Sequence, residues 1–167
     1  MSFDMCKPKV LMTGAIRGIG LAIAAKFAQE GAELALLVKD PENDGAKKIQ
    51  TELMQLGGKI TLIKADIRVE SEIAKGVKDA ADAMNGIDVC VLNASVVVLS
   101  NSEETTVDVY DMMQNVNARS NFILAKQARE YLQHSDIAHI CFISPPINLD
   151  PKWLGAHLAY TSSRYLS

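Results

Sequence analysis

Five short apolar runs along the chain predict the strands of a sheet. Each run is apolar almost throughout, without regular alternation with polar residues, which is typical of parallel strands buried on both faces. The predicted strands are Lys9–Met12, Glu33–Val38, Lys59–Ala65, Asp88–Leu92 and His139–Ile143. Strands of this kind need helices on both sides of the sheet to cover them.

The segments between these runs show the three-to-four-residue apolar spacing of helices. After the first strand, Ile19, Ile23 and Phe27 are spaced to form one face, and we expect that face to be buried. The predicted helices span 19–30, 41–56, 70–84 and 103–132, and a last one runs from Ala156 to the end after an irregular stretch at 144–154.

Regular alternation of strand and helix predicts an α/β fold with a doubly wound, Rossmann-like parallel sheet. Right-handed crossovers then give the strand order 3-2-1-4-5. No linker or internal repeat divides the sequence, so we expect a single dinucleotide-binding domain over residues 1–167. Ligands of such sheets bind beyond the carboxyl ends of the strands.

The first strand runs directly into a glycine-rich turn. The turn and the start of the next helix contain Gly14, Ala15, Ile16, Arg17, Gly18, Ile19 and Gly20. Glycines let the backbone approach a ligand closely, and the following helix N-terminus offers free N–H groups to a phosphate. The spacing is G-x-x-x-G-x-G, not the common G-x-G-x-x-G, so on its own it also fits a simple tight turn.

Two basic residues favour NADP over NAD as the cofactor. An NAD site usually has a carboxylate at the end of the second strand, where it would repel a 2′-phosphate. Here Val38 is followed by Lys39, and Arg17 in the turn is also in reach of a 2′-phosphate. Asp40 argues the other way, and a solvated lysine is the alternative interpretation of Lys39.

Polar residues also follow the other strands. Asp66 fits either an acceptor for the adenine amino group or a simple turn residue, and Asn93 is placed to pack against the adenosine ribose. Ser144 follows the fifth strand. Asn117 stands among the apolar positions of the long helix, which fits either a surface position or a functional one.

Composition narrows the function class. The net charge of −3, with no basic stripe, argues against nucleic acid as a main partner. No apolar run approaches the ~20 residues of a membrane span, and no signal peptide is evident, so we expect an intracellular, cytoplasmic protein. Cys6, Cys90 and Cys141 lack metal-binding spacing, so no metal site is expected. Cys90 and Cys141 are expected in the core.

Taken together, these residues resemble the short-chain dehydrogenase/reductase family. The matching pieces are TGAIRGIG at 13–20, Asp66, NAS at 93–95, Asn117, Ser144 and a tyrosine motif at Tyr160, in the family's order. The stretches at 115–128 and 138–165, which include ISPPINLDPKW, are similar to one subgroup in particular. The resemblance runs from about Lys9 to the last residue.

The resemblance implies NADP-dependent hydride transfer between a carbonyl and an alcohol on a lipid- or steroid-like substrate. Tyr160 would be the general acid/base, Ser144 would orient the substrate oxygen, and Asn117 would hold a water that passes the proton onward. It also implies homo-oligomers built through the fourth and last helices, and a peroxisomal or mitochondrial location.

Two departures from the family leave an alternative open. Arg164 stands where the family has the lysine that binds the cofactor ribose and lowers the tyrosine pKa; its guanidinium keeps the charge but does not give up a proton. The 167-residue sequence is also expected to lack the family's last strands. The alternative is therefore a catalytically inactive, truncated homologue that binds nucleotide weakly or acts through protein contacts.

Overall fold

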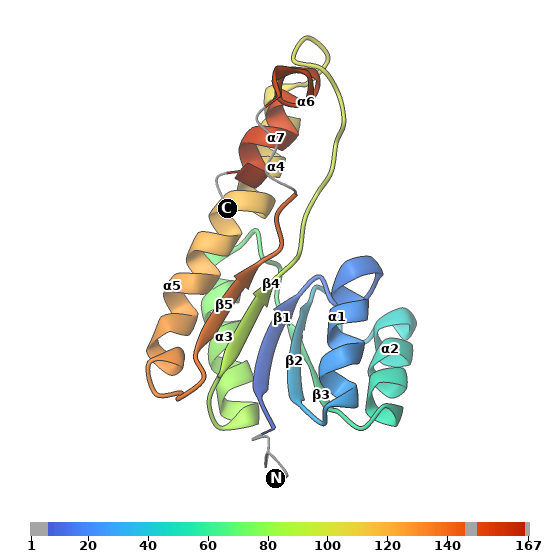
Figure 1. Cartoon of the computed structure of the whole chain (residues 1–167), viewed down its shortest axis with the longest axis vertical. Helices are drawn as coiled ribbons and strands as arrows, with labels where there is room; N and C mark the ends of the chain where they lie inside the picture. The colour runs from blue at the N-terminus through green and yellow to red at the C-terminus, as the bar shows by residue number, and fades with distance from the viewer. Residues whose placement is uncertain (1–6, 146–149, 166–167) are drawn as a thin grey trace.

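The computed structural model describes residues 7–145 and 150–165, and it contains the predicted parallel sheet (Figure 1). The strands are β1 (Lys9–Thr13), β2 (Glu33–Val38), β3 (Lys59–Lys64), β4 (Val89–Leu92) and β5 (His139–Phe142). Their order is β3-β2-β1-β4-β5, and every neighbouring pair is parallel. The predicted fold class and strand order are confirmed.

The helices follow the prediction closely in the first half of the chain and less closely in the second. They are α1 (Gly18–Gln29), α2 (Asp44–Gln55), α3 (Glu70–Met84), α4 (Val107–Gln114), α5 (Ser120–Leu132), α6 (Pro151–Ala156) and α7 (Leu158–Tyr165). A π-helical turn, η1 (Asn115–Arg119), joins α4 to α5. The predicted helix 103–132 thus begins late, where Thr106 caps it, and contains a change of helical type.

The C-terminal prediction was wrong in one respect. The stretch 144–154 was expected to be irregular throughout, but α6 begins within it, at Pro151, where Asp150 caps the helix by accepting a hydrogen bond from the Lys152 N–H. Proline suits this first position because it has no N–H to leave unsatisfied. Residues 146–149, which hold part of the ISPPINLDPKW stretch, lie outside the described residues.

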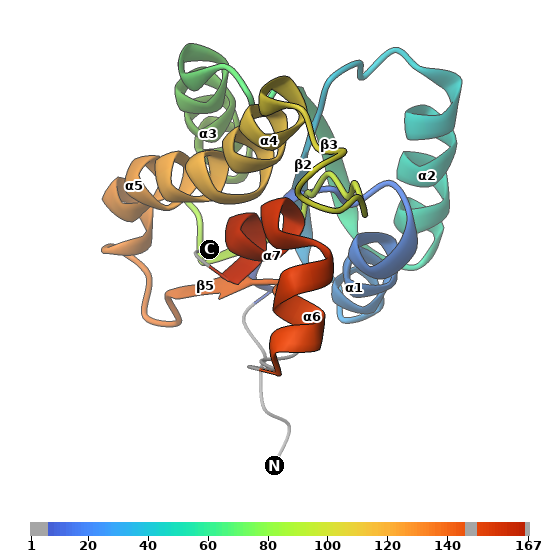
Figure 2. The same ribbon diagram turned by 90° about the horizontal axis from the view of Figure 1, so that it is seen from above.

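The sheet is the middle of three layers (Figure 2). On one face Leu11, Cys90 and Leu92 pack in a core with apolar residues of α3 and α5. On the other face Val10 and Met12 pack with residues of α1 and α2. At the carboxyl end of the sheet, α4 extends beyond the strands, α7 packs against it, and α6 packs against α7 (Figure 1).

Helix α1 buries a different face from the one predicted. Gly20, Ala24 and Ala28 are buried, whereas Ile19 is 66% exposed and the other two predicted residues are only partly buried. A surface of small residues lets the helix lie close against the sheet, and the larger residues Ile23 and Phe27 flank the contact. Residue size, which the apolar spacing ignores, therefore decided which face turned inward.

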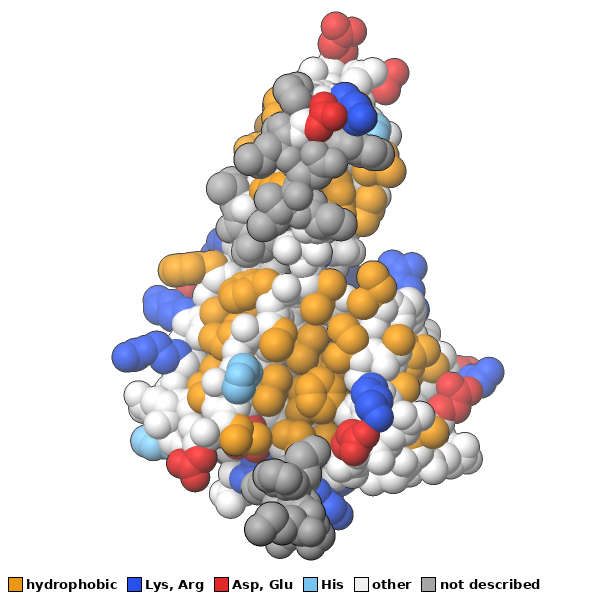
Figure 3. All heavy atoms as spheres, in the orientation of Figure 1, with side chains coloured by type: hydrophobic (Ala, Val, Ile, Leu, Met, Phe, Trp, Pro, Cys, Tyr) orange, Lys and Arg blue, Asp and Glu red, His pale blue; other side chains and the backbone are white. Residues whose placement is uncertain are grey.

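Strand β5 forms one edge of the sheet, and all four of its residues are exposed. Cys141 was predicted to be a core residue and is instead exposed, whereas Cys90 on the neighbouring strand is buried as predicted. Burial raises the pKa of the Cys90 thiol to about 12. Figure 3 shows hydrophobic side chains gathered over the sheet on the face that it views.

Candidate active site

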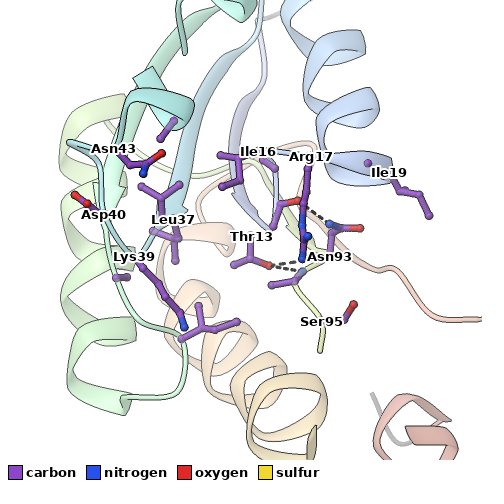
Figure 4. A pocket seen from close by; sticks show the side chains of 18 residues that line it. Thr13, Ile16, Arg17, Ile19, Leu37, Lys39, Asp40, Asn43, Asn93 and Ser95 are labelled. Carbon is purple, nitrogen blue, oxygen red and sulfur yellow. Dashed lines mark hydrogen bonds between the residues drawn. The ribbon is translucent and has the colours of Figure 1, made fainter. Parts of the chain in front are cut away.

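A cavity of about 800 Å³ opens at the carboxyl ends of β1, β2 and β4 (Figure 4). Its walls come from the glycine-rich turn, the end of β2, the residues after β3 and the residues after β4. The lining includes Thr13, Gly14, Ala15, Ile16, Arg17, Gly18, Ile19, Lys39, Asp40, Asn43, Ile67, Asn93 and Ser95. This is the position at which ligands bind in doubly wound sheets.

Two glycines of the turn have backbone conformations that other residues rarely adopt. Gly14 has φ +65° and Gly18 has φ +55°. Gly20 is required for a different reason, because a Cβ placed there would lie 2.1 Å from the Gly14 carbonyl oxygen. The turn is therefore folded back tightly on the first residues of α1.

The first turn of α1 has no side-chain cap. Its leading N–H groups are left to bind water or an anion, and the helix dipole favours negative charge at this point. By contrast, Asn43 caps α2 by accepting a hydrogen bond from the Gly45 N–H at 2.9 Å. The uncapped helix at the cavity wall and the cradle closed by Gly20 both fit a bound pyrophosphate.

Thr13 fixes the turn to the neighbouring strand, and sequence analysis missed it. Its buried hydroxyl oxygen accepts hydrogen bonds from the N–H groups of Asn93 and Ala94, each at 3.2 Å. The Asn93 side chain in turn donates to the Gly14 carbonyl at 2.9 Å. The partners are some 80 residues apart in sequence, so no local pattern reveals this link. The Asn93 side chain therefore holds the glycine-rich turn in place through its bond to the Gly14 carbonyl.

Lys39 and Arg17 reach the cavity from different elements, Lys39 from the end of β2 and Arg17 from the turn before α1 (Figure 4). The Lys39 side chain is 63% exposed, and its ammonium lies 3.8 Å from Asp66 Oδ2. Asp40 is also at the cavity, where its carboxylate accepts a hydrogen bond from the Glu42 N–H at 3.0 Å. The cavity wall thus carries two cations and one carboxylate that is engaged in a turn.

Asp66 is held as a carboxylate by its neighbours. The Arg68 side chain donates to both carboxylate oxygens, and the Arg68 N–H donates to Oδ1 at 3.0 Å. These bonds, led by the side-chain contact with Arg68, lower the pKa of Asp66 to about 2. Asp66 is therefore an engaged turn residue beside the cavity, and its role as an acceptor for the adenine amino group stays a prediction.

The four predicted catalytic residues lie outside the cavity lining, at the end of the sheet where α4 and α7 meet. Asn117 is completely buried, which excludes the surface position. Its side-chain oxygen accepts from the Val96 N–H at 2.8 Å, and its amide donates to the Val96 carbonyl and to Ser163 Oγ, each at 2.9 Å. The backbone carbonyl of Asn117 accepts a hydrogen bond from the Asn121 amide at 2.8 Å.

Helix α7 carries Tyr160 and Arg164. Tyr160 is partly buried, and Arg164 is 4% exposed and donates a hydrogen bond to the Ile143 carbonyl. Ile143 immediately precedes Ser144, which is exposed. The Asn117–Ser163 and Arg164–Ile143 bonds thus bring the segments that carry all four predicted residues to one place.

No group of three or more histidine, cysteine or acidic side chains that could hold a metal ion occurs in the part of the chain that the structure describes. None of the helices described is long and apolar enough to cross a membrane.

Comparison with known proteins establishes the family. A family model described as short chain dehydrogenase matches residues 8–164. The chain therefore belongs to the short-chain dehydrogenase family, a class of nicotinamide-dependent oxidoreductases that act on small molecules. Hydroxysteroid dehydrogenase-like protein 2 of Homo sapiens is 40% identical over 161 residues, which are 93% of this chain and 38% of that protein. The Xenopus laevis protein of the same name is 39% identical over the same length.

These relatives confirm the subgroup that ISPPINLDPKW and its neighbouring stretches resemble. The chain spans about two fifths of the length of the curated relatives it matches. Solved structures agree with the fold. A short chain dehydrogenase from Mycobacterium thermoresistibile is 32% identical with a TM-score of 0.88, and the match covers 95% of this chain and 58% of that one.

Two other similar solved structures are of enzymes described with a nicotinamide nucleotide. A short chain dehydrogenase from Burkholderia cenocepacia in complex with NADP is 25% identical, with a TM-score of 0.84 and coverage of 96% and 64%. The NADH-dependent reductase A1-R′ of alginate metabolism is 27% identical, with a TM-score of 0.85 and coverage of 97% and 68%. The family fold thus accommodates either nucleotide.

Proposed function

We propose that the chain binds NADP(H) and belongs to an oxidoreductase that interconverts a carbonyl and an alcohol on a lipid- or steroid-like substrate. The observation that carries the proposal is the cavity wall, where Lys39 and Arg17 flank a phosphate cradle closed by Gly20. A 2′-phosphate placed between the two cations would form charge-assisted hydrogen bonds, which NAD cannot form. The bound nicotinamide would give a hydride to the carbonyl carbon in reduction and take one from the alcohol carbon in oxidation.

The residues around the cofactor would have separate tasks. The uncapped N-terminus of α1 would bind the pyrophosphate, and Asp66 would accept a hydrogen bond from the adenine amino group. Tyr160 would hold the proton that moves to or from the substrate oxygen, and Ser144 would hydrogen-bond the same oxygen. Arg164, four residues after Tyr160 on α7, would supply a permanent positive charge on the same helix.

Fluorescence titration of NADPH and NADH tests the cofactor preference. We expect NADPH to bind more tightly, and Lys39→Ala to weaken NADPH binding by about tenfold with little change for NADH, because a hydrogen bond to a charged group is worth about 1.5–3 kcal/mol. Lys126→Ala, an exposed lysine on α5, is the matched control. Failure of both nucleotides to bind at about millimolar concentration, or equal losses for both in the Lys39 variant, would refute the proposal.

The second candidate is a catalytically inactive homologue that binds nucleotide or acts through protein contacts. Arg164 favours this candidate, because its buried guanidinium is bonded to the Ile143 carbonyl and does not give up a proton. A carbonyl-reduction assay on apolar ketones with NADPH distinguishes the two. Nucleotide binding without turnover, in the chain and in an Arg164→Lys variant alike, would favour the inactive homologue.

The remaining features of the proposal follow from the resemblance. Residues 1–167 would act as one dinucleotide-binding unit, and copies would associate through the α4–α5 region and α7. A peroxisomal or mitochondrial location would fit the subgroup. Light scattering of the purified chain tests the association, and imaging of a tagged protein tests the location.

A further inference from the structure

Asn117 connects two parts of the molecule that are distant in sequence. All of its side-chain hydrogen-bonding groups are engaged, with one side of the amide on the Val96 backbone and the other on Ser163 of α7. Val96 directly follows Ser95, a residue of the cavity wall. The amide therefore links the wall of the nucleotide cavity to the helix that carries Tyr160.

Ser163 completes the connection. It is fully buried, and its hydroxyl accepts the Asn117 amide while it donates to the Tyr160 carbonyl at 2.7 Å. The hydroxyl thus bonds to the backbone of the residue whose side chain would meet the substrate. The series links the Val96 N–H and carbonyl, the Asn117 amide, the Ser163 hydroxyl and the Tyr160 carbonyl, and each of these groups has a partner within it. Such a series is rigid because an unpaired member is costly.

The π turn sets the position of the series. Asn117 lies within η1, and the Asn121 amide donates to the Asn117 carbonyl at 2.8 Å. This bond fixes the backbone from which the Asn117 side chain reaches both partners. Single π turns inside α-helices are frequent at functional sites.

We propose that Ser163 is a positioning residue that, through Asn117 and Val96, couples occupation of the nucleotide cavity to the placement of Tyr160. The inference rests on the proposed function, in which the cavity holds a dinucleotide and Tyr160 meets the substrate. Binding that orders the segment after β4 would then order α7, and loosening of α7 would loosen the cavity wall.

Residue-resolved hydrogen exchange of the nucleotide-free protein tests the link itself. Ser163→Ala should speed exchange at the Val96 N–H by about tenfold, because the Asn117 amide loses one of its fixed partners. Alanine is a better helix former than serine, so a general weakening of α7 would not explain faster exchange. Ser163→Thr, which keeps the hydroxyl, should restore slow exchange.

Ser162→Ala is the matched control. Ser162 is also on α7 and bonds to the Gln114 amide at 3.0 Å, but it has no bond to Asn117 or Val96 among the described contacts. It should leave exchange at Val96 unchanged. If Ser163→Ala does not fold, Ser163→Cys, of similar volume and weaker hydrogen bonding, should give a smaller acceleration at the same amide. Unchanged exchange at Val96 in the Ser163 variants, or equal acceleration in the control, would overturn the inference.

A second arm adds NADPH. In the unaltered protein, saturating NADPH should slow exchange across Leu158–Tyr165, and Ser163→Ala should abolish that slowing while it still binds NADPH. Binding without any slowing in the unaltered protein would overturn the coupling. Absence of NADPH binding would instead refute the proposed function, while the first arm would still decide whether Ser163 and Val96 are linked.

Discussion

Replacing Gly20 with alanine tests how tightly the glycine-rich turn is folded against α1. The added Cβ would lie 2.1 Å from the Gly14 carbonyl oxygen and 2.5 Å from Asn93 Nδ2. Both atoms belong to groups that cannot swing away freely, since the Gly14 carbonyl is backbone and the Asn93 amide is bonded to it at 2.9 Å. Relief of the clash must therefore break that bond and move the turn.

The magnitude follows from these contacts. Forcing an extra carbon into a tight contact costs about 1–3 kcal/mol, and the lost hydrogen bond costs about 1 kcal/mol. The better helix propensity of alanine returns up to about 1 kcal/mol. We expect the free energy of unfolding to fall by about 2 kcal/mol, and the affinity for NADPH to fall at least about tenfold because the displaced turn forms the phosphate cradle.

Urea unfolding and nucleotide titration of the same preparations measure the two effects. Gly155→Ala is the control, since a Cβ there would meet nothing within 4 Å and α6 gains a better helix former. Gly18→Ala tests the effect of backbone conformation without a steric clash. A Cβ at Gly18 also meets nothing within 4 Å, but its φ of +55° is one that alanine rarely adopts. If Gly20→Ala matches Gly155→Ala in stability and binds nucleotide normally, the described packing of the turn is incorrect.

Two further changes test other parts of the structure. Because the pKa of folded Asp66 is lowered from 3.8 to about 2 by Arg68, the ionised carboxylate stabilises the fold above its ordinary pKa and loses that effect as pH falls from about 4 to about 2. In urea unfolding, Asp66→Asn should therefore lower the free energy of unfolding by about 1 kcal/mol near neutral pH, a value that allows for the half-exposed Arg68, and by almost nothing near pH ~2. A difference in this free energy that does not change with pH would contradict the prediction. With the cysteine of the N-terminal segment changed to serine, Cys141 should react with a thiol reagent in the folded protein and Cys90 only after unfolding, because Cys90 is buried and its pKa is raised to about 12. Equal rates for the two thiols would contradict the placement of β5.

The strands and their order could be predicted because buried parallel strands leave a clear mark, a continuous apolar run with turn residues at each end. The inward face of α1 could not be predicted from apolar spacing, since Gly20, Ala24 and Ala28 are buried for their small size. The edge position of β5 follows from the predicted strand order, but the exposure of Cys141 does not, because an apolar run does not reveal whether anything covers its faces.

The candidate site divides in the same way. The glycine-rich turn and Lys39 can be recognised from sequence because the residues that define each of them are adjacent in the chain. The role of Thr13 depends on N–H groups that follow the neighbouring strand, and the role of Ser163 depends on an amide 46 residues away in sequence. Neither contact can therefore be predicted from a local sequence pattern. Asn117 could be singled out by its polarity, but only the structure shows that it is completely buried.

The π turn at Asn115–Arg119 also limits how the length of this chain can change. A π turn accommodates one residue more than the α-helical path around it, so deletion of a single residue there would leave a regular and intrinsically more favourable helix. The same deletion would keep the helices on either side in phase but would redirect the side chains within the turn, and would separate Asn117 from one of its two partners. A protein selected only for a stable helix would tolerate that loss. A protein that depends on the Val96–Ser163 link would not, so insertions and deletions should be excluded from these five residues, whereas the loop between Val96 and α4 is not constrained by this link.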